Sequence, residues 1–297
     1  MFNGIIYNQG IVTKIIGDPE DPRNDFERII RQFGLPTSFS QQVLAECESR
    51  LKMLDLEISR RIDYRDQKSF TVDPDNASDF DDAIYIEEVG KCVFRIWVHI
   101  ADVSFFIPEG SMLDREVCER GTSVYLIDRV VHMLPENFAS SYCSLVPNQD
   151  RLAITVRIDV CLDGKIKQYS IEESVIRSSA RLTYSAVQAV IDNDMSETSK
   201  ALDFKKQIIM LSEVSRIRKD LRHNRGALDL EIPECRIVLN DEGIPVDIGK
   251  NQILFSNGIV EESMFLANEC VGRFCAKNNL SVLYRVHAPP SESKLEN

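Results

Sequence analysis

The stretch Thr71-Val-Asp-Pro-Asp-Asn-Ala-Ser-Asp-Phe-Asp-Asp-Ala83 places five carboxylates within ten residues, and no lysine or arginine occurs between positions 69 and 90. The apolar Phe70 and Val72 at its start and the alternating Ala83-Ile-Tyr-Ile86 at its end predict a loop held between two strands. Two like charges about 4 Å apart repel by about 4 kcal/mol at an effective dielectric of about 20. The run therefore predicts a bound cation, against the alternative of an ordinary solvated acidic loop.

The residue types in this run narrow the choice of cation. A calcium loop of the EF-hand type that began at Asp73 would need Gly at its sixth position and Glu at its twelfth, where this chain has Ser78 and Ile84. An all-oxygen donor set without His or Cys suits Mg²⁺ or Mn²⁺, which share their coordination with substrate phosphates. The run thus indicates phosphodiester chemistry.

The composition is that of an ordinary globular protein, with 297 residues, 43% hydrophobic and 28% charged. A formal net charge of -12 argues against a general nucleic-acid binder, although an enzyme with contacts in a narrow channel need not be basic. The sequence has no long apolar stretch and no secretion signal at its start, so we expect a cytoplasmic protein without membrane insertion. Its eight scattered cysteines lack zinc spacing and are predicted to be buried, reduced thiols.

The remaining patterns predict an α+β fold. We expect short strands at Gly4-Ile-Ile-Tyr7 and Gly10–Ile16, a helix over about residues 40–58, and strands over 92–100 and 152–162. Two later helices are predicted over about 196–223 and 260–276. The buried side of the first should carry Leu202, Ile209, Val214, Ile217 and Leu221.

Several motifs accompany the aspartate run in one order, among them Val98-His-Ile-Ala-Asp-Val-Ser104, Arg120-Gly-Thr-Ser-Val-Tyr-Leu126, Ala180-Arg-Leu-Thr-Tyr184 and Val260-Glu-Glu-Ser-Met264. Together they resemble the catalytic domain of the ribonuclease II / ribonuclease R family of exoribonucleases, over roughly residues 11–290. The resemblance implies a mixed sheet with packed helices, the RNB-type catalytic domain. Its N-terminal part would occupy residues 61–297, after a remnant of a cold-shock OB-fold (1–20) and a helical connector (21–60), with the family protein truncated at both ends.

The resemblance also implies an activity, which is Mg²⁺-dependent 3′-to-5′ hydrolysis of single-stranded RNA to nucleoside 5′-monophosphates, with Mn²⁺ as a possible substitute and no nucleotide cofactor. Asp73, Asp79, Asp81 and Asp82 fall on the family's four catalytic acids. We assign Asp73, Asp79 and Asp82 to metal binding, Asp81 to the attacking water, and Asp75 to the periphery or solvent. The family's later arginine-rich motif and OB-fold are not in this sequence. The alternative is therefore a weakly active or inactive remnant that binds RNA or a protein.

Three further residues fall on RNA-contacting positions of the family. Tyr125 matches a tyrosine that stacks on the 3′-terminal nucleotide, Tyr184 a second tyrosine near the active site, and Glu262 a glutamate at the terminal nucleotide, with Glu261 one residue away. Stacking is worth about 1–3 kcal/mol per base. The competing interpretations are core tyrosines and a helix-surface carboxylate. The family's second stacking aromatic is replaced by Leu230, and the four histidines, His99 and His287 among them, are predicted to be structural.

Overall fold

The computed structural model describes residues 10–18, 20–21, 24–127, 129–194, 200–228, 235–240, 242, 244–250, 253–286, 288 and 291. The chain forms two compact units. The larger unit contains Ser49–Ile107, Glu136–Leu230 and Ile253–Asn297, and the smaller contains Met1–Glu48, Pro108–Pro135 and Glu231–Gln252. All four predicted catalytic aspartates belong to the larger unit.

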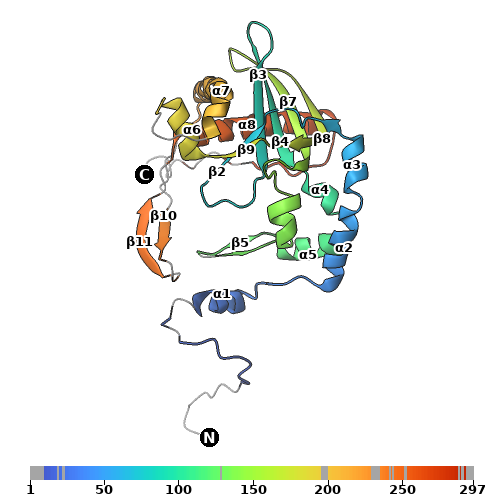
Figure 1. The fold of residues 1–297 in the computed structure, drawn as a ribbon, viewed down its shortest axis with the longest axis vertical. Helices are drawn as coiled ribbons and strands as arrows, with labels where there is room; N and C mark the ends of the chain where they lie inside the picture. The colour runs from blue at the N-terminus through green and yellow to red at the C-terminus, as the bar shows by residue number, and fades with distance from the viewer. Residues whose placement is uncertain are drawn as a thin grey trace. The chain divides into compact units, whose positions relative to one another are not determined.

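The larger unit is built on a seven-stranded mixed sheet with the order β1-β8-β7-β4-β3-β2-β9 (Figure 1). Its centre is an antiparallel meander, and the outer pairs β2–β9 and β1–β8 are parallel. This confirms the predicted α+β class. The strands are β1 (Ile62–Asp63), β2 (Phe70–Asp73), β3 (Asp82–Glu88), β4 (Val93–Ala101), β7 (Asp150–Cys161), β8 (Ile166–Arg177) and β9 (Ala180–Thr183).

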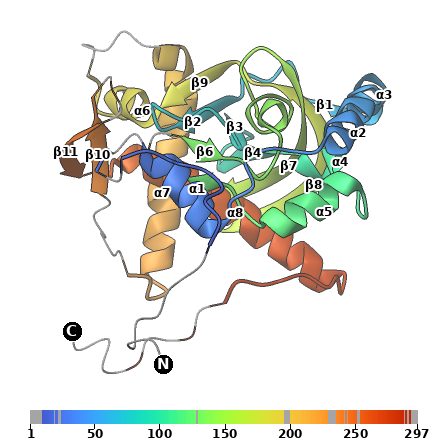
Figure 2. The same ribbon diagram turned by 90° about the horizontal axis from the view of Figure 1, so that it is seen from below.

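Helices α6 (Tyr184–Ile191), α7 (Lys205–His223) and α8 (Phe255–Lys277) pack against this sheet and enclose the main core (Figure 2). Their apolar side chains meet those of the alternating strand positions, such as Ile84 and Ile158. The turn between β7 and β8 requires Gly164, because its φ is 76° and a Cβ there would approach Ile217 Cγ2 to 3.0 Å. The hairpin and α7 are thereby packed closely together.

The predicted strands 92–100 and 152–162 correspond to β4 and β7, but the helices differ from their predicted bounds. The predicted helix 40–58 is two helices, α2 (Gln41–Leu51) and α3 (Leu54–Arg60), separated by a turn in which Met53 N–H donates to Arg50 O. The 196–223 segment, where described, starts with a 3₁₀ turn (Lys200–Phe204) before α7. The last helix, α8, is longer than predicted.

The predicted buried face of α7 is wrong at Ile209, which is 41% exposed. Buried residues on α7 recur at Ile208, Leu211, Val214 and Arg218, with spacings of three and four. Ile209 lies about 100° away from this stripe around the helix. The other predicted positions agree with the structure better, because Val214 is buried and Leu202, Ile217 and Leu221 are half-buried.

A buried ion network joins α3 to the end of β4. Arg61, whose side chain is 2% exposed, donates from Nε to Glu57 Oε1 at 2.6 Å and from Nη2 to Asp102 Oδ2 at 2.5 Å. Asp102 Oδ1 in turn accepts hydrogen bonds from Ser104 Oγ and from the Phe105 N–H. Asp102 thereby caps the N-terminus of α4 (Val103–Phe106). Removing one partner of such a buried network costs about 3–5 kcal/mol.

The smaller unit contains α1 (Asp25–Phe33), α5 (Met112–Arg120) and two hairpins, β5 (Val124–Tyr125) with β6 (Val130–Val131) and β10 (Cys235–Leu239) with β11 (Pro245–Lys250). Arg120 ties this unit together, since its guanidinium donates to the carbonyls of Pro36, Ser38 and His132. The same group lies 3.7 Å from the ring centroid of Phe39. One arginine thus satisfies backbone groups from segments far apart in the sequence.

Three sequence predictions fail or lie outside the described residues. Residues 10–18 contain no strand, with Ile11 and Ile15 exposed, so the predicted strand Gly10–Ile16 is wrong, while Gly4–Tyr7 lies outside the described part. The eight cysteines all lie within the described residues and form no disulfide, but only Cys47, Cys143, Cys270 and Cys275 are buried. Among the described residues, no helix is long and apolar enough to cross a membrane.

Candidate active site

The aspartate run connects two neighbouring strands at one end of the sheet. Asp73 ends β2 and Asp82 begins β3, and the two strands pair antiparallel through Phe70 and Ile84. The loop between them brings Asp79 and Asp81 within electrostatic reach, since both raise the pKa of Asp73. The sequence run is therefore also a cluster in space, and Asp75 is an exposed member of the loop.

Burial gives these carboxylates an unusual affinity for protons. It raises the pKa of Asp82 to about 7, with smaller contributions from the negative charges of Asp73 and Asp81. Burial likewise raises the pKa of Asp73 to about 6, although Thr71 Oγ1 donates to Asp73 Oδ2 at 2.6 Å and opposes the shift. The pKa of Asp81 is raised in the same direction by burial and then by Asp79. All members of the cluster are carboxylates, so each ionised member disfavours the ionisation of its neighbours.

A divalent cation fits this donor set. Asp82 Oδ2 is buried and accepts no hydrogen bond from any described residue, so a lone pair is left without a partner. All donors are carboxylate oxygens, the ligands that Mg²⁺ and Mn²⁺ prefer. In the described part of the chain, no three acidic, His or Cys groups already stand close enough to hold a metal ion. Binding would have to draw the aspartates closer together.

The backbone of the loop is fixed at Phe80, the residue between Asp79 and Asp81. Its N–H donates to Ser144 Oγ at 2.8 Å and its carbonyl accepts from Leu145 N–H at 2.8 Å. Ser144 and Leu145 are fully buried, and the buried Arg151 donates to the carbonyl of Ser144 at 3.1 Å. We call Ser144 and Leu145 the Phe80 clamp. The clamp follows a π-helical turn (Phe138–Tyr142), and sequence reasoning did not identify it.

A cation does approach the cluster, from a distant part of the sequence. Arg181 on β9 pairs in register with Thr71 on β2, and its charge lowers the pKa of Asp73. Its Nη2 donates to the Pro74 carbonyl and its guanidinium lies 5.8 Å from the Phe80 ring centroid. Arg181 Nε is buried and bonds to no described residue. The absence of neighbouring lysine and arginine in the sequence therefore did not exclude a nearby positive charge.

Tyr184 and one glutamate share the surroundings of the aspartates. Tyr184 begins α6 directly after β9, and burial raises its pKa to about 12, assisted by the charges of Asp82, Asp73 and Glu261. Glu262 is different, because its side chain is 4% exposed and its Oε1 accepts from Arg222 Nε and Nη2 at 2.8 and 2.6 Å. Glu262 is thus not a surface carboxylate. The glutamate whose charge raises the pKa of Tyr184 is its neighbour, Glu261.

The other predicted residues lie on other elements. Tyr125 lies on β5 in the smaller unit and is 67% exposed, so it is not a core tyrosine. His99 is fully buried in β4, where its Nδ1 is 2.8 Å from Thr155 Oγ1. Leu230 and His287 lie outside the described residues.

Comparison with known proteins places this arrangement in a family. Residues 61–297 match the RNB domain model. The chain is 39% identical over 290 residues to ribonuclease R of Aquifex aeolicus, a match that covers 97% of this chain and 41% of that protein. It is 38% identical over 285 residues to ribonuclease R of Thermotoga maritima, covering 94% of this chain and 40% of that protein. The chain thus spans about two fifths of these relatives.

A solved structure agrees. Mycoplasma genitalium RNase R in complex with double-stranded RNA superposes with a TM-score of 0.85 at 28% identity, covering 96% of this chain and 50% of that one. The same protein has also been solved in complex with ribose-methylated single-stranded RNA, at a TM-score of 0.84 and 27% identity over 96% of this chain and 44% of that one. The chain therefore belongs, through its RNB domain, to the ribonuclease II / ribonuclease R family.

Proposed function

We propose that this chain supplies the metal-binding half of a 3′-to-5′ exoribonuclease that hydrolyses single-stranded RNA to nucleoside 5′-monophosphates with Mg²⁺, for which Mn²⁺ can substitute. The observation that carries the proposal is the cluster of Asp73, Asp79, Asp81 and Asp82 with its unpartnered Asp82 oxygen. The two M. genitalium RNase R complexes named above hold RNA, which supports RNA as the substrate class. The polarity and the product follow from the family resemblance.

The four aspartates of the cluster would have different roles in catalysis. Asp73, Asp79 and Asp82 would hold the metal ion, which when bound neutralises phosphate charge and lowers the pKa of a water molecule. Asp81, the more exposed member, would orient that water by accepting its proton. The Phe80 clamp would keep Asp79 and Asp81 in register, since both flank the clamped residue.

The groups around the cluster would bind the RNA end. Arg181 carries a charge beside Asp73 and an unpartnered Nε, so it would contact a substrate phosphate. Tyr184 and Glu261 would contact the terminal nucleotide, with Glu261 in the role first assigned to Glu262. The exposed ring of Tyr125 would stack on a base.

The test is hydrolysis of an oligoribonucleotide with a 3′ label or a 5′ label, in Mg²⁺ and in EDTA. The proposal predicts immediate release of a labelled mononucleotide from the 3′-labelled strand and stepwise shortening of the 5′-labelled one, in Mg²⁺ only. Chromatography should identify the product as a 5′-monophosphate. The matched variants are Asp81→Asn, which should be inactive, and Asp75→Asn, which changes an exposed aspartate of the same loop and should be active.

Retention of the RNA without cleavage would instead support the alternative, a remnant that binds RNA. Internal cleavage fragments would contradict the exonuclease assignment, while leaving the RNB family membership intact.

A further inference from the structure

The side chain of Asp73 is held by a buried hydroxyl. Thr71 Oγ1 donates to Asp73 Oδ2 at 2.6 Å, a distance typical of a hydroxyl that donates to an ionised carboxylate. The two residues are two positions apart on β2, so their side chains leave the strand on the same face. Thr71 is fully buried, with an exposed fraction of 0%. Water therefore has no access to take the place of this hydroxyl.

The backbone around Asp73 is restrained as well. Thr71 and Asp73 pair in parallel register with Arg181 and Thr183 of β9. Arg181 also donates from Nη2 to the carbonyl of Pro74, the residue that follows Asp73. A residue that precedes proline is restricted to extended conformations, which suits the last residue of a strand. Rotation of its side chain is therefore the main freedom left to Asp73, and the Thr71 hydrogen bond restrains that rotation.

The hydrogen bond distinguishes the two oxygens of the Asp73 carboxylate. Oδ2 accepts from Thr71, and within the described residues no further hydrogen bond to the Asp73 side chain occurs. Asp82 differs, because its Oδ2 is buried and accepts from no described residue. Asp73 Oδ1 is therefore available to a cation, while the plane of the carboxylate is set by Thr71.

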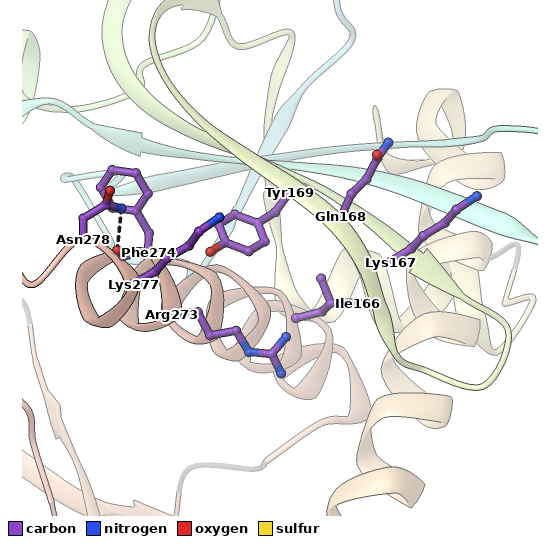
Figure 3. A pocket seen from close by; sticks show the side chains of 8 residues that line it. All are labelled: Ile166, Lys167, Gln168, Tyr169, Arg273, Phe274, Lys277 and Asn278. Carbon is purple, nitrogen blue, oxygen red and sulfur yellow. Dashed lines mark hydrogen bonds between the residues drawn. The ribbon is translucent and has the colours of Figure 1, made fainter.

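Such convergence is missing from the cavity of about 480 Å³ between the start of β8 and the end of α8 (Figure 3). Lys167 and Gln168 point away from α8, which carries Lys277. Gln168 instead donates through Nε2 to Asp159 Oδ2 at 2.6 Å. The charged groups that line this cavity thus share no ligand position. Around Asp73, in contrast, the polar contacts meet on one carboxylate and on the backbone that carries it.

Building on the proposed function, in which Asp73 binds the metal ion, we propose that Thr71 is a positioning residue that holds this carboxylate in its metal-binding orientation. A ligand that is oriented in advance loses less conformational freedom on binding, so the affinity for the ion rises. Mg²⁺ demands near-ideal octahedral geometry, whereas Ca²⁺ accepts a more flexible set of ligands. Thr71 thereby also favours Mg²⁺ over Ca²⁺.

The test compares Thr71→Val with Thr155→Val as its matched control. Valine keeps the branched shape of threonine without the hydroxyl, and it suits a strand. Thr155 is also fully buried, and its Oγ1 lies 2.8 Å from His99 Nδ1 and 2.5 Å from Ser174 Oγ. Thr155 lies on β7, which β4 and β3 separate from β2, so at a strand spacing of about 4.8 Å it is about 14 Å away. Both variants lose a buried hydroxyl, but only the first loses a contact with Asp73.

Metal affinity is measured without RNA, from the free Mn²⁺ signal in electron paramagnetic resonance titrations, with Mg²⁺ and Ca²⁺ as competitors. Loss of a hydrogen-bond partner of a metal ligand costs about 10- to 100-fold in affinity. Thr71→Val should therefore weaken Mn²⁺ and Mg²⁺ binding by about 10- to 100-fold and Ca²⁺ binding by less, so that the preference for Mg²⁺ over Ca²⁺ falls. Thr71→Ser keeps the hydroxyl and should restore both affinity and preference. Thr155→Val should bind all three ions as the parent does.

Thermal melts of the metal-free chain separate this positioning role from a purely structural one. Both valine variants should lose stability, because each leaves a buried polar group without its partner, but only Thr71→Val should change metal binding. If Thr71→Val binds the three ions with parental affinity and preference, the positioning role is refuted and the proposed function stands. If its affinity falls as expected but the parent does not hydrolyse RNA in Mg²⁺, the proposed function alone is refuted. A parent chain that binds no Mn²⁺ would overturn both.

Discussion

The Phe80 clamp yields a quantitative prediction through the variant Ser144→Ala. This change removes only the hydroxyl that accepts the Phe80 N–H at 2.8 Å, and it leaves no large cavity because serine and alanine differ by one oxygen. The Leu145 N–H still holds the Phe80 carbonyl. The variant therefore loosens one side of the peptide that lies between Asp79 and Asp81, without touching either carboxylate.

The size of the effect follows from the burial of these groups. A buried donor left without a partner costs about 1–3 kcal/mol, and Phe80 is partly buried, so we expect a loss of stability of about 1–2 kcal/mol. Misplacement of catalytic groups by about 1 Å can cost about 100-fold in rate. We therefore expect the single-turnover hydrolysis rate of Ser144→Ala to fall by about 10- to 100-fold. The Mg²⁺ concentration for half-maximal rate should rise.

The matched control is Ser212→Ala. Ser212 is also buried, and its Oγ donates to the Ile209 carbonyl within α7, away from the aspartate loop. This variant loses a buried hydroxyl but should keep the parental Mg²⁺ dependence. If both variants show the same modest loss of stability and the same unaltered rate and Mg²⁺ requirement, then the clamp does not position the carboxylates and the reasoning is refuted.

Three further predictions concern the aspartates and Tyr125. Asp81→Asn should abolish RNA hydrolysis while leaving folding and RNA binding nearly intact, as measured by a thermal melt and a filter-binding assay; cleavage at the parental rate would exclude the catalytic role. Tyr125→Ala should alter the length of the final product with little change in melting temperature, because the ring is 67% exposed. A sharp fall in stability with unchanged products would show that Tyr125 has a structural role instead. Burial raises the pKa of Asp73 to about 6 and of Asp82 to about 7, so without metal the folded chain binds more protons than the unfolded chain between about pH 4 and 7. The stability of the metal-free chain should therefore fall as the pH rises through this range, and the fall should be smaller in Asp82→Asn. Stabilisation by Mg²⁺ should be larger at pH 8 than at pH 6, because the metal ligands must be deprotonated. If neither the metal-free stability nor the Mg²⁺ effect depends on pH, the result would argue against this site.

The sequence predicted those parts of the site whose residues are close together in the chain. The aspartate run lies between two strands because apolar residues flank it on both sides, and this pattern needs no tertiary information. Arg181 and Ser144 could not be found in the same way. Arg181 reaches the cluster through the parallel pairing of β2 with β9, and Ser144 through a hydrogen bond to a residue 64 positions earlier. Such pairings depend on the register of the whole sheet, which the residues around Asp73 do not encode.

The different burial of Glu261 and Glu262 could have been predicted from the sequence, by helical phase. On α8 the buried positions include Ile259, Ser263 and Leu266. Glu262 follows Ile259 by three positions and precedes Leu266 by four, so it lies on the same face of the helix. Glu261 lies about 100° away and remains exposed. A glutamate in an apolar stripe requires a cationic partner, which Arg222 of α7 provides at 2.6 Å. The motif Val260-Glu-Glu-Ser-Met264 therefore combines two roles in adjacent residues, with Glu262 joining two helices and Glu261 left to act on Tyr184 beside the aspartates.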